Sequence, residues 1–198
     1  MSRSALSQAA LDQLYYDARS YNGWLDKPVS EDQIRQIHDL VKMAPTSANM
    51  QPGRFVWCTS PEAKARLAAC ALESNQAKII TAPVCVIIGM DYEYHEQLPW
   101  LFPHTNARSW FTNDRKLRED SAFRNASLQG AYLMLAARSI GLDVGPMSGI
   151  DLDAVNRAFF ADQPDVVTNF ICSIGHGDPA SIFGRSPRPD FERFNTIA

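Results

Sequence analysis

The apolar run PVCVIIGM at residues 83–90 constrains the fold more than any other stretch of the sequence. It contains no charged side chain, and it is far too short to span a bilayer. A continuous apolar run of this length is typical of a strand that is buried on both faces. We therefore expect it to form the central strand of a sheet. The 198 residues suffice for one domain with a sizeable core, and no repeat, low-complexity tract or linker divides residues 1–198.

The rest of the chain carries the periodicity of helices mixed with short strands. Ser30 and Gln33 predict a capping box at the start of one helix, and Pro45 is expected to stop that helix. Gly141 is expected to end a long helix whose middle consists mainly of small and apolar residues. The predicted helices cover 6–14, 31–44, a segment from 61, 118–140 and a segment from 151, and the predicted strands cover 55–60 and 166–175. Residues 91–117, the corner at 143–150 and the tail from 176 show no strong period. This mixture predicts an α+β fold rather than a regular βαβ series.

Charge and composition exclude several classes of function. The formal net charge of -3 gives no sign that nucleic acid is the main partner. The N-terminus is too polar for a signal peptide, and no segment is long enough to span a membrane, so a cytoplasmic protein is expected. The cysteines lack CxxC spacing and the histidines lack metal-ligand spacing, so reduced buried thiols and no metal site are predicted. These residues are Cys58, Cys70, Cys85, Cys172, His38, His95, His104 and His176.

Familiar catalytic motifs are not matched. GHGDPA at 175–180 loosely resembles a dinucleotide-binding fingerprint, but Pro179 interrupts it and no acidic residue follows at the right distance. The sequence also lacks the Gly-x-Ser-x-Gly of a nucleophile elbow and a phosphate-gripping Walker loop.

The polar stretch MAPTSANMQP at 43–52 is the first candidate binding segment. A tight turn after Pro45 would expose the amides and hydroxyls of Thr46 and Ser47. In extended chain, the amides of Asn49 and Gln51 would face one side and suit the edge of a flat heterocycle. The alternative is a polar turn that is tied only to its own backbone.

Four further segments accompany this stretch. ARSYNGW offers Arg19, Ser20 and Asn22, a combination that suits phosphate, which arginine binds bidentately. FGRSPRPDF adds Arg185 and Arg188 in the tail, SNQAK adds an asparagine and a lysine, and GPMSG supplies a kinked backbone that could lie flat against a ring. Taken singly, each of these segments is more often a solvated loop.

Taken in this order, ARSYNGW, APTSANMQP, SNQAK with APVCVIIG, GLDVGPMSG and the closing arginines resemble the FMN-dependent nitroreductase family over nearly the whole chain. LPWLFPHTNARSWF followed by AFRNASLQGAYLM looks more narrowly like the malonic semialdehyde reductase branch associated with pyrimidine degradation. The resemblance implies an α+β nitroreductase-like fold with a central mixed, largely antiparallel sheet flanked by helices. It also implies a homodimer with two FMN sites, in which the C-terminal tail extends onto the partner subunit.

The resemblance implies cofactor roles residue by residue. Arg19, Ser20 and Asn22 would hold the phosphate and ribityl chain of FMN, with Arg185 and Arg188 closing over the phosphate. Four positions would line the flavin, partly from the partner subunit: Thr46, Ser47, Asn49 and Gln51. Two would address its pyrimidine end: Asn75 and Lys78. Four would pack under the ring near N5: Pro146, Met147, Ser148 and Gly149.

The implied reaction is a ping-pong hydride transfer through flavin N5 from NADPH or NADH to a small-molecule acceptor. Residues 98–112 would shape the acceptor pocket with His104, Arg108, Trp110 and Phe111. Arg108 would clamp a carboxylate, as malonic semialdehyde requires for its reduction to 3-hydroxypropanoate. The alternative is that Arg108 makes a surface ion pair while the aromatic side chains merely cover the flavin.

Three other functions stay open at this point. The chain could be a broad NAD(P)H-dependent nitroaromatic or quinone reductase with no dedicated carboxylate site. It could also be a flavin-binding protein that does not turn over a nicotinamide, or a polar-loop protein that binds no flavin.

Overall fold

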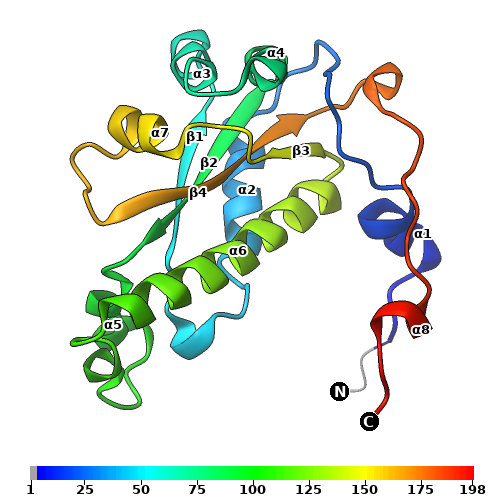
Figure 1. Ribbon diagram of the computed structural model, residues 1–198. Coiled ribbons are helices and arrows are strands. Elements are labelled where there is room, and N and C mark those ends of the chain that lie inside the picture. The colour runs from blue at the N-terminus through cyan, green and yellow to red at the C-terminus, as the bar shows by residue number, and fades with distance from the viewer. Residues whose placement is uncertain (1–3) are drawn as a thin grey trace.

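A computed structural model describes residues 4–198. Four strands form one sheet in the order β1-β2-β4-β3: β1 is Gly53–Cys58, β2 is Val84–Asp91, β4 is Val166–Gly175 and β3 is Asp143–Met147. Every pairing between these strands is antiparallel. The parallel element is an isolated bridge between Ser20 and Val144. The α+β fold with a largely antiparallel sheet is therefore confirmed, and the 83–90 run is central in it (Figure 1).

Helices cover both faces of the sheet (Figure 1). Side chains of β2 alternate between the two layers, because successive strand residues point to opposite faces. Val86 and Ile88 pack with α2 (Glu31–Val41) and α6 (Arg115–Ser139), whereas Cys85 and Ile87 pack with α3 (Pro61–Ala68), α4 (Glu73–Thr81) and α7 (Leu152–Phe159). Burial on both sides explains why this strand has no polar face.

Most helix boundaries follow from capping chemistry in the sequence. Ser30 and Gln33 form the predicted capping box, and Ser60 and Asp151 cap the helices that follow them. The long helix ends as expected before Gly141, which has φ of 81°. Its N-terminus lies three residues earlier than predicted, where the Asp114 side chain accepts a hydrogen bond from the Leu117 amide.

Three segments differ from the prediction. The corner at 143–150 is not irregular throughout, because β3 occupies its first five residues and pairs with β4 despite Pro146. Residues 73–81 form α4, a helix that the periodicity did not indicate. The helix expected to run to Pro45 ends at Val41, and Ala44 lies after it.

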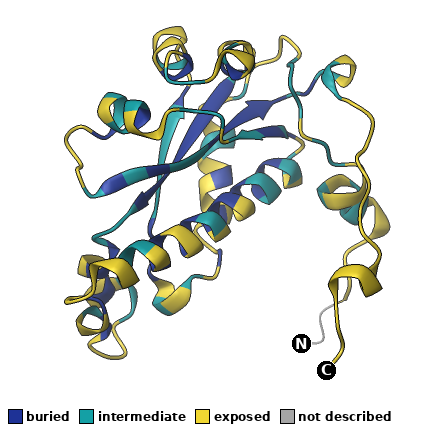
Figure 2. Ribbon diagram, in the orientation of Figure 1, coloured by how far each residue is buried: buried dark blue, intermediate teal, exposed yellow. Residues whose placement is uncertain are grey.

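The two ends of the chain run together beside the main body (Figure 1). The N-terminal segment holds α1 (Gln8–Leu11) and the π-helical turn η1 (Asp12–Tyr16), and the C-terminal tail holds η5 (Pro179–Ser181) and α8 (Phe191–Phe194). Arg19 donates to the carbonyl of Phe183, and Arg185 donates to that of Tyr16 at 2.6 Å. Both segments are largely exposed (Figure 2). Among residues 4–198, no helix combines the length and apolar character needed to cross a membrane.

Candidate functional site

The loop at 46–51, named the β1-side loop because it leads into β1, has an unusual backbone. Ala48, Asn49 and Gln51 all have positive φ, at 47°, 49° and 43°. Such conformations are strained for residues other than glycine and persist only where the surroundings over-determine them. The extended chain expected for Asn49 and Gln51 is therefore wrong. A 3₁₀ turn, η2 (Ser47–Asn49), replaces it and still brings the two amides together, with Gln51 Nε2 donating to Asn49 Oδ1 at 2.9 Å.

Two buried side-chain amides of α6 hold this strained loop, and neither was predicted from the sequence. Asn125 Oδ1 accepts from the Ser47 amide at 2.8 Å, and Gln129 donates to Gln51 Oε1 at 2.6 Å. Both α6 side chains are buried, at 2% and 3% exposure. The Thr46 hydroxyl accepts from the Gln51 amide at 3.2 Å, so part of the loop is also tied to its own backbone. In the sequence, the signal for Asn125 and Gln129 was their i, i+4 spacing within a run of otherwise small and apolar residues.

A cavity of about 560 Å³ opens beside the β1-side loop. Asn49, Gln51 and Gly53 line it together with Gln129, and Trp100 and Leu101 of α5 (Leu98–Leu101) form part of its wall. The Trp100 side chain is 75% exposed, which is unusual for so large an apolar group. This combination of apolar walls and a few convergent amides is typical of a small-molecule site.

The four predicted acceptor-pocket residues lie in the segment 94–111, which we name the cap. Phe111 is buried and packs edge-on against Tyr94 at 5.3 Å between ring centroids. His104 packs on Phe102, and Trp110 lies half-exposed beside the same ring. Arg108 lines a separate, smaller pocket of about 230 Å³. None of the four lines the 560 Å³ cavity within the described chain, so their role at an acceptor stays a prediction.

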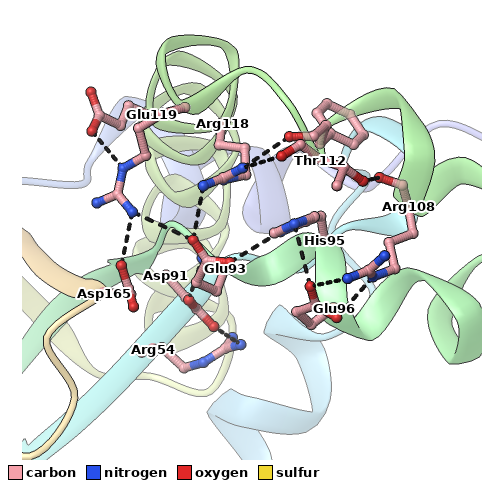
Figure 3. A network of polar contacts seen from close by, with 12 residues as sticks. Arg54, Asp91, Glu93, His95, Glu96, Arg108, Thr112, Arg118, Glu119 and Asp165 are labelled. Atoms are coloured by element: carbon pink, nitrogen blue, oxygen red, sulfur yellow. Dashed lines mark hydrogen bonds and ion pairs between the residues drawn. The ribbon is translucent and has the colours of Figure 1, made fainter.

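A network of ion pairs lies within the cap and beside it (Figure 3), and Arg118 of α6 donates to the Phe111 carbonyl of the cap at 3.0 Å. Arg108 binds Glu96 through two hydrogen bonds of 2.8 and 2.7 Å, which lowers the pKa of that carboxyl. Arg118 donates to Glu93 at 3.0 Å. Arg115 pairs with the same Glu93 carboxylate and with Asp165. The surface ion pair considered for Arg108 is thus present in the structure.

Glu93, His95 and Glu96 also form the group most like a metal site in the described part of the chain, with ligand atoms within 4.8 Å of one another. Both carboxylates are already neutralised by arginines, however, so the geometry favours a structural role for the group. The absence of a metal site stays a prediction.

A second group of predicted site residues gathers around β3, and we name it the β3-side group. It comprises residues 19–22, Asn75, Lys78, residues 146–149 and Arg185. Asn75 Nδ2 donates to the Gly149 carbonyl at 3.1 Å, and Lys78 Nζ donates to Asn75 Oδ1 at 3.2 Å. Pro146, Met147 and Ser148 line a cavity of about 460 Å³ with Phe123 of α6.

The N-terminal part of the β3-side group is bound to the strand itself. The Tyr21 amide donates to the Val144 carbonyl at 3.0 Å, and Ser20 forms a bridge to the same residue. Asn22 donates to the Ser181 carbonyl at 3.1 Å, which joins the segment to the tail. Residues 19–22 therefore lie between β3 and the tail.

Positive charge accumulates on this side without acidic partners. Arg19, Lys78 and Arg185 donate to neutral oxygen atoms, and Arg188 donates only to carbonyls within the tail. Across residues 4–198, none of the four forms an ion pair. Cations left without counter-charges are suited to an anion such as a phosphate group.

The β1-side loop and the β3-side group lie at opposite edges of the sheet. The strand order places β1 and β3 three spacings apart, which corresponds to about 14 Å. Along the strands, Gly53 pairs with Met90 at one end, whereas Val144 pairs with Ile174 at the other. One chain therefore brings the predicted residues together as two groups and not as one site.

The four thiols are free, and those of Cys58, Cys85 and Cys172 are buried. Burial raises the pKa of Cys58 to about 11 and that of Cys172 to about 12, and it raises the pKa of Cys85 as well. A thiol with so high a pKa is a poor nucleophile. The prediction of reduced thiols with a packing role therefore agrees with their positions.

Comparisons with known proteins match this arrangement to one family. The Nitroreductase family model matches residues 17–176. A protein of Burkholderia lata named "Putative NADH dehydrogenase/NAD(P)H nitroreductase" is 56% identical over 189 residues, or 96% of each chain. Two solved structures described as a "putative nitroreductase" share the fold at 23% identity each. The structure from Bacillus subtilis has a TM-score of 0.88 and covers 97% of this chain and 100% of its own. The structure from Exiguobacterium sibiricum, solved in complex with FMN, has a TM-score of 0.85 and covers 100% of each chain. The present chain is a member of the nitroreductase family.

Proposed function

We propose that the protein is an FMN-dependent NAD(P)H oxidoreductase. The observation that carries this proposal is the set of three cations in the β3-side group, Arg19, Lys78 and Arg185, which form no ion pair among residues 4–198 and suit the phosphate of a flavin nucleotide. The name of the Burkholderia lata relative and the FMN in the Exiguobacterium sibiricum structure support it. When bound, FMN supplies hydride transfer between a nicotinamide and an acceptor. A cytoplasmic location would give it access to NAD(P)H.

The residues of the β3-side group fit such a cofactor. Arg19, Ser20 and Asn22 would hold the phosphate and ribityl chain, and Arg185 and Arg188 would close over the phosphate. Residues 146–149 would lie under the ring, where a Cβ at Gly149 would come within 2.6 Å of the Asn75 amide nitrogen and would force that side chain to move. Lys78 would place its positive charge at the pyrimidine end and stabilise negative charge there.

We further propose that the working unit is a homodimer. Thr46, Ser47, Asn49 and Gln51 lie at the other edge of the sheet, so they could reach the same flavin only from a second copy. A two-fold dimer that joins the β3-side group of each copy to the β1-side loop of the other would make two complete sites.

The exposed surface supports this assembly. Large apolar side chains remain uncovered on α6, on the N-terminal segment and along the tail, where a second copy would bury them. Among them are Tyr15, Tyr16, Phe123, Leu128, Phe183, Phe194 and Ile197. An open groove of about 710 Å³ beside the unpaired edge of β1 offers the partner's tail a place to lie.

For the acceptor we propose malonic semialdehyde, reduced to 3-hydroxypropanoate, on the strength of the LPWLFPHTNARSWF resemblance. Arg108 would bind the substrate carboxylate, but it would first have to release Glu96. This occupied state favours the second candidate, a broad nitroaromatic or quinone reductase, which the name of the relative also supports. Replacing Arg108 with Met should raise KM for the acidic aldehyde and leave a neutral quinone unaffected. Equal losses with both acceptors would eliminate the clamp.

The decisive experiment is a visible spectrum of the purified protein without oxygen, before and after addition of NADPH or NADH. We expect a bound flavin spectrum that the nicotinamide bleaches and that an acceptor restores. Comparing turnover with malonic semialdehyde, menadione and a nitrofuran then separates the two acceptor classes. A bound flavin that NAD(P)H leaves oxidised would point to a flavin-binding protein without turnover. Colourless protein with no affinity for FMN would contradict the proposal.

A further inference from the structure

A chain of four hydrogen bonds runs from the start of β1 through α6 and the β1-side loop to the cap. The Gly53 amide donates to Gln129 Oε1 at 2.8 Å, and Gln129 Nε2 donates to Gln51 Oε1 at 2.6 Å. Gln51 Nε2 then donates to Asn49 Oδ1 at 2.9 Å, and Asn49 Nδ2 donates to the Leu101 carbonyl at 2.8 Å. We name this chain the amide relay.

The direction of the amide relay is fixed at both ends by backbone groups. A backbone N–H can only donate and a carbonyl oxygen can only accept, whereas a side-chain amide can do either by turning over. Because Gly53 donates at one end and Leu101 accepts at the other, each of the three side chains between them has one allowed orientation. The relay therefore leaves one N–H of Asn49 without a partner in it, beside the 560 Å³ cavity.

We propose that Gln129 is a positioning residue that sets the orientation of Gln51 and Asn49 and thereby presents a hydrogen-bond donor to an acceptor atom of the flavin. The proposal rests on the proposed function, because the flavin is the ligand concerned. Gln129 suits this role because it is 3% exposed, lies within the 25-residue helix α6, and makes two hydrogen bonds that hold its own amide in one orientation. The relay also links the loop to α5, so the cavity wall at Leu101 depends on the same orientation.

Replacing Gln129 with Glu should reverse the relay. An ionised carboxylate can accept from Gly53 but cannot donate to Gln51, so the Gln51 amide must turn over to donate back. Asn49 must then turn over as well, which places its oxygen against the Leu101 carbonyl and breaks the bond to the cap. A protonated carboxyl can accept through one oxygen and donate through the other, which restores the original direction.

The test is the affinity for FMN of the full-length protein, measured by quenching of flavin fluorescence from about pH 5 to about pH 9, a range that spans the raised pKa values of buried carboxyls. For Gln129→Glu we expect the Kd to be about tenfold weaker than wild type at the alkaline end and to return to within about threefold at the acid end. The control Gln163→Glu makes the same chemical change on the exposed loop between α7 and β4 and should match wild type throughout. A Gln129→Glu variant that matches wild type at both ends would overturn the proposal.

Two further measurements cover the remaining outcomes. Gln129→Met keeps the volume and removes both hydrogen bonds, so it should weaken FMN binding at every pH, and wild-type affinity in this variant would also overturn the relay. In the wild-type protein, the side-chain amide protons of Gln129 and Gln51 should exchange slowly with solvent by NMR, and fast exchange would contradict the relay without any variant. If wild-type protein binds no FMN while these protons are protected, the proposed function fails and the relay stands.

Discussion

Gly145 lies in β3 where the predicted phosphate-binding segment, residues 19–22, packs against the strand. We expect Gly145→Ala to disrupt both that segment and its contact with β3. A Cβ at this position would lie 2.4 Å from the Tyr21 carbonyl oxygen and 3.3 Å from the ring of Trp24. The first contact is with backbone, so no side-chain rotation relieves it. Residues 19–22 must move away from β3.

The size of the effect follows from that displacement. Ordinary van der Waals contact begins at 3.4 Å, so the segment must shift by about 1 Å. This stretches the 3.0 Å bond between the Tyr21 amide and the Val144 carbonyl beyond hydrogen-bonding range. Overpacking costs about 1–3 kcal/mol, and the lost hydrogen bond adds about 1 kcal/mol. We expect the free energy of unfolding to fall by about 2–4 kcal/mol. FMN affinity should fall about tenfold because Arg19 and Ser20 move with the segment.

The assay is urea unfolding followed by circular dichroism at fixed protein concentration, together with FMN titration of the folded variant. Gly184→Ala is the matched control, since nothing in the same chain lies within 4 Å of a Cβ there, and its unfolding free energy should stay within about 1 kcal/mol of wild type. Wild-type stability and wild-type FMN affinity in Gly145→Ala would refute the reasoning.

Three further outcomes are expected. Arg118→Met should lower the free energy of unfolding, measured by urea titration, by about 2–4 kcal/mol, because Arg118 is largely buried and pairs with a carboxylate. The control Arg35→Met removes an exposed arginine and should cost under about 0.5 kcal/mol. Equal losses in the two variants would contradict this. A thiol reagent near neutral pH should label Cys70 first in the folded protein, since Cys70 is partly exposed and burial raises the pKa of Cys58 to about 11. Mass spectrometry that finds Cys58 labelled as fast as Cys70 would contradict this. Burial lowers the pKa of His176 below 6.5, so the unfolded chain binds more protons and stability should fall as pH drops through about 6.5. In calorimetry, the stability of His176→Gln should depend less steeply on pH than that of wild type. An unchanged slope of stability against pH would exclude His176 as the group responsible.

Local chemistry in the sequence predicted much of the fold. The capping box at Ser30 and the caps at Ser60 and Asp151 act within a few residues, so their effect is visible without tertiary information. The run at 83–90 was equally clear, because a strand buried on both faces leaves no polar position. The helix stop at Gly141 rests on backbone conformation alone.

The missed elements depend on partners far away in the chain. Gly145 and Pro146 are typical of a turn, yet β3 forms there because β4 supplies the hydrogen-bonding partner. Asn125 and Gln129 lie in a long helix, where polar side chains usually face solvent. Their partners in the β1-side loop and at the start of β1 come 76–78 positions earlier, and no local pattern records that.

The residues of the candidate site were predicted one by one, and the resemblance also implied that part of the loop at 46–51 would come from a partner subunit. The motifs at 19–22, 75–78 and 146–149 lie around β3, and their role at a cofactor stays a prediction. The β1-side loop lies at the other edge of the sheet, and only the sheet order reveals this. Sequence order alone carries no distance, so a site shared between two copies resembles one site in the linear chain.

The central claim is that two copies of the chain complete each flavin site, and mixing two inactive variants tests it most directly. Arg19→Glu damages the β3-side group, and Gln51→Trp fills the cavity beside the β1-side loop. We expect neither variant alone to bind FMN, whereas an equimolar mixture that is unfolded and refolded together should recover about one quarter of the wild-type sites, because half of the dimers are mixed and each has one intact site. A mixture that binds no FMN, although both variants fold and pair, would contradict the account.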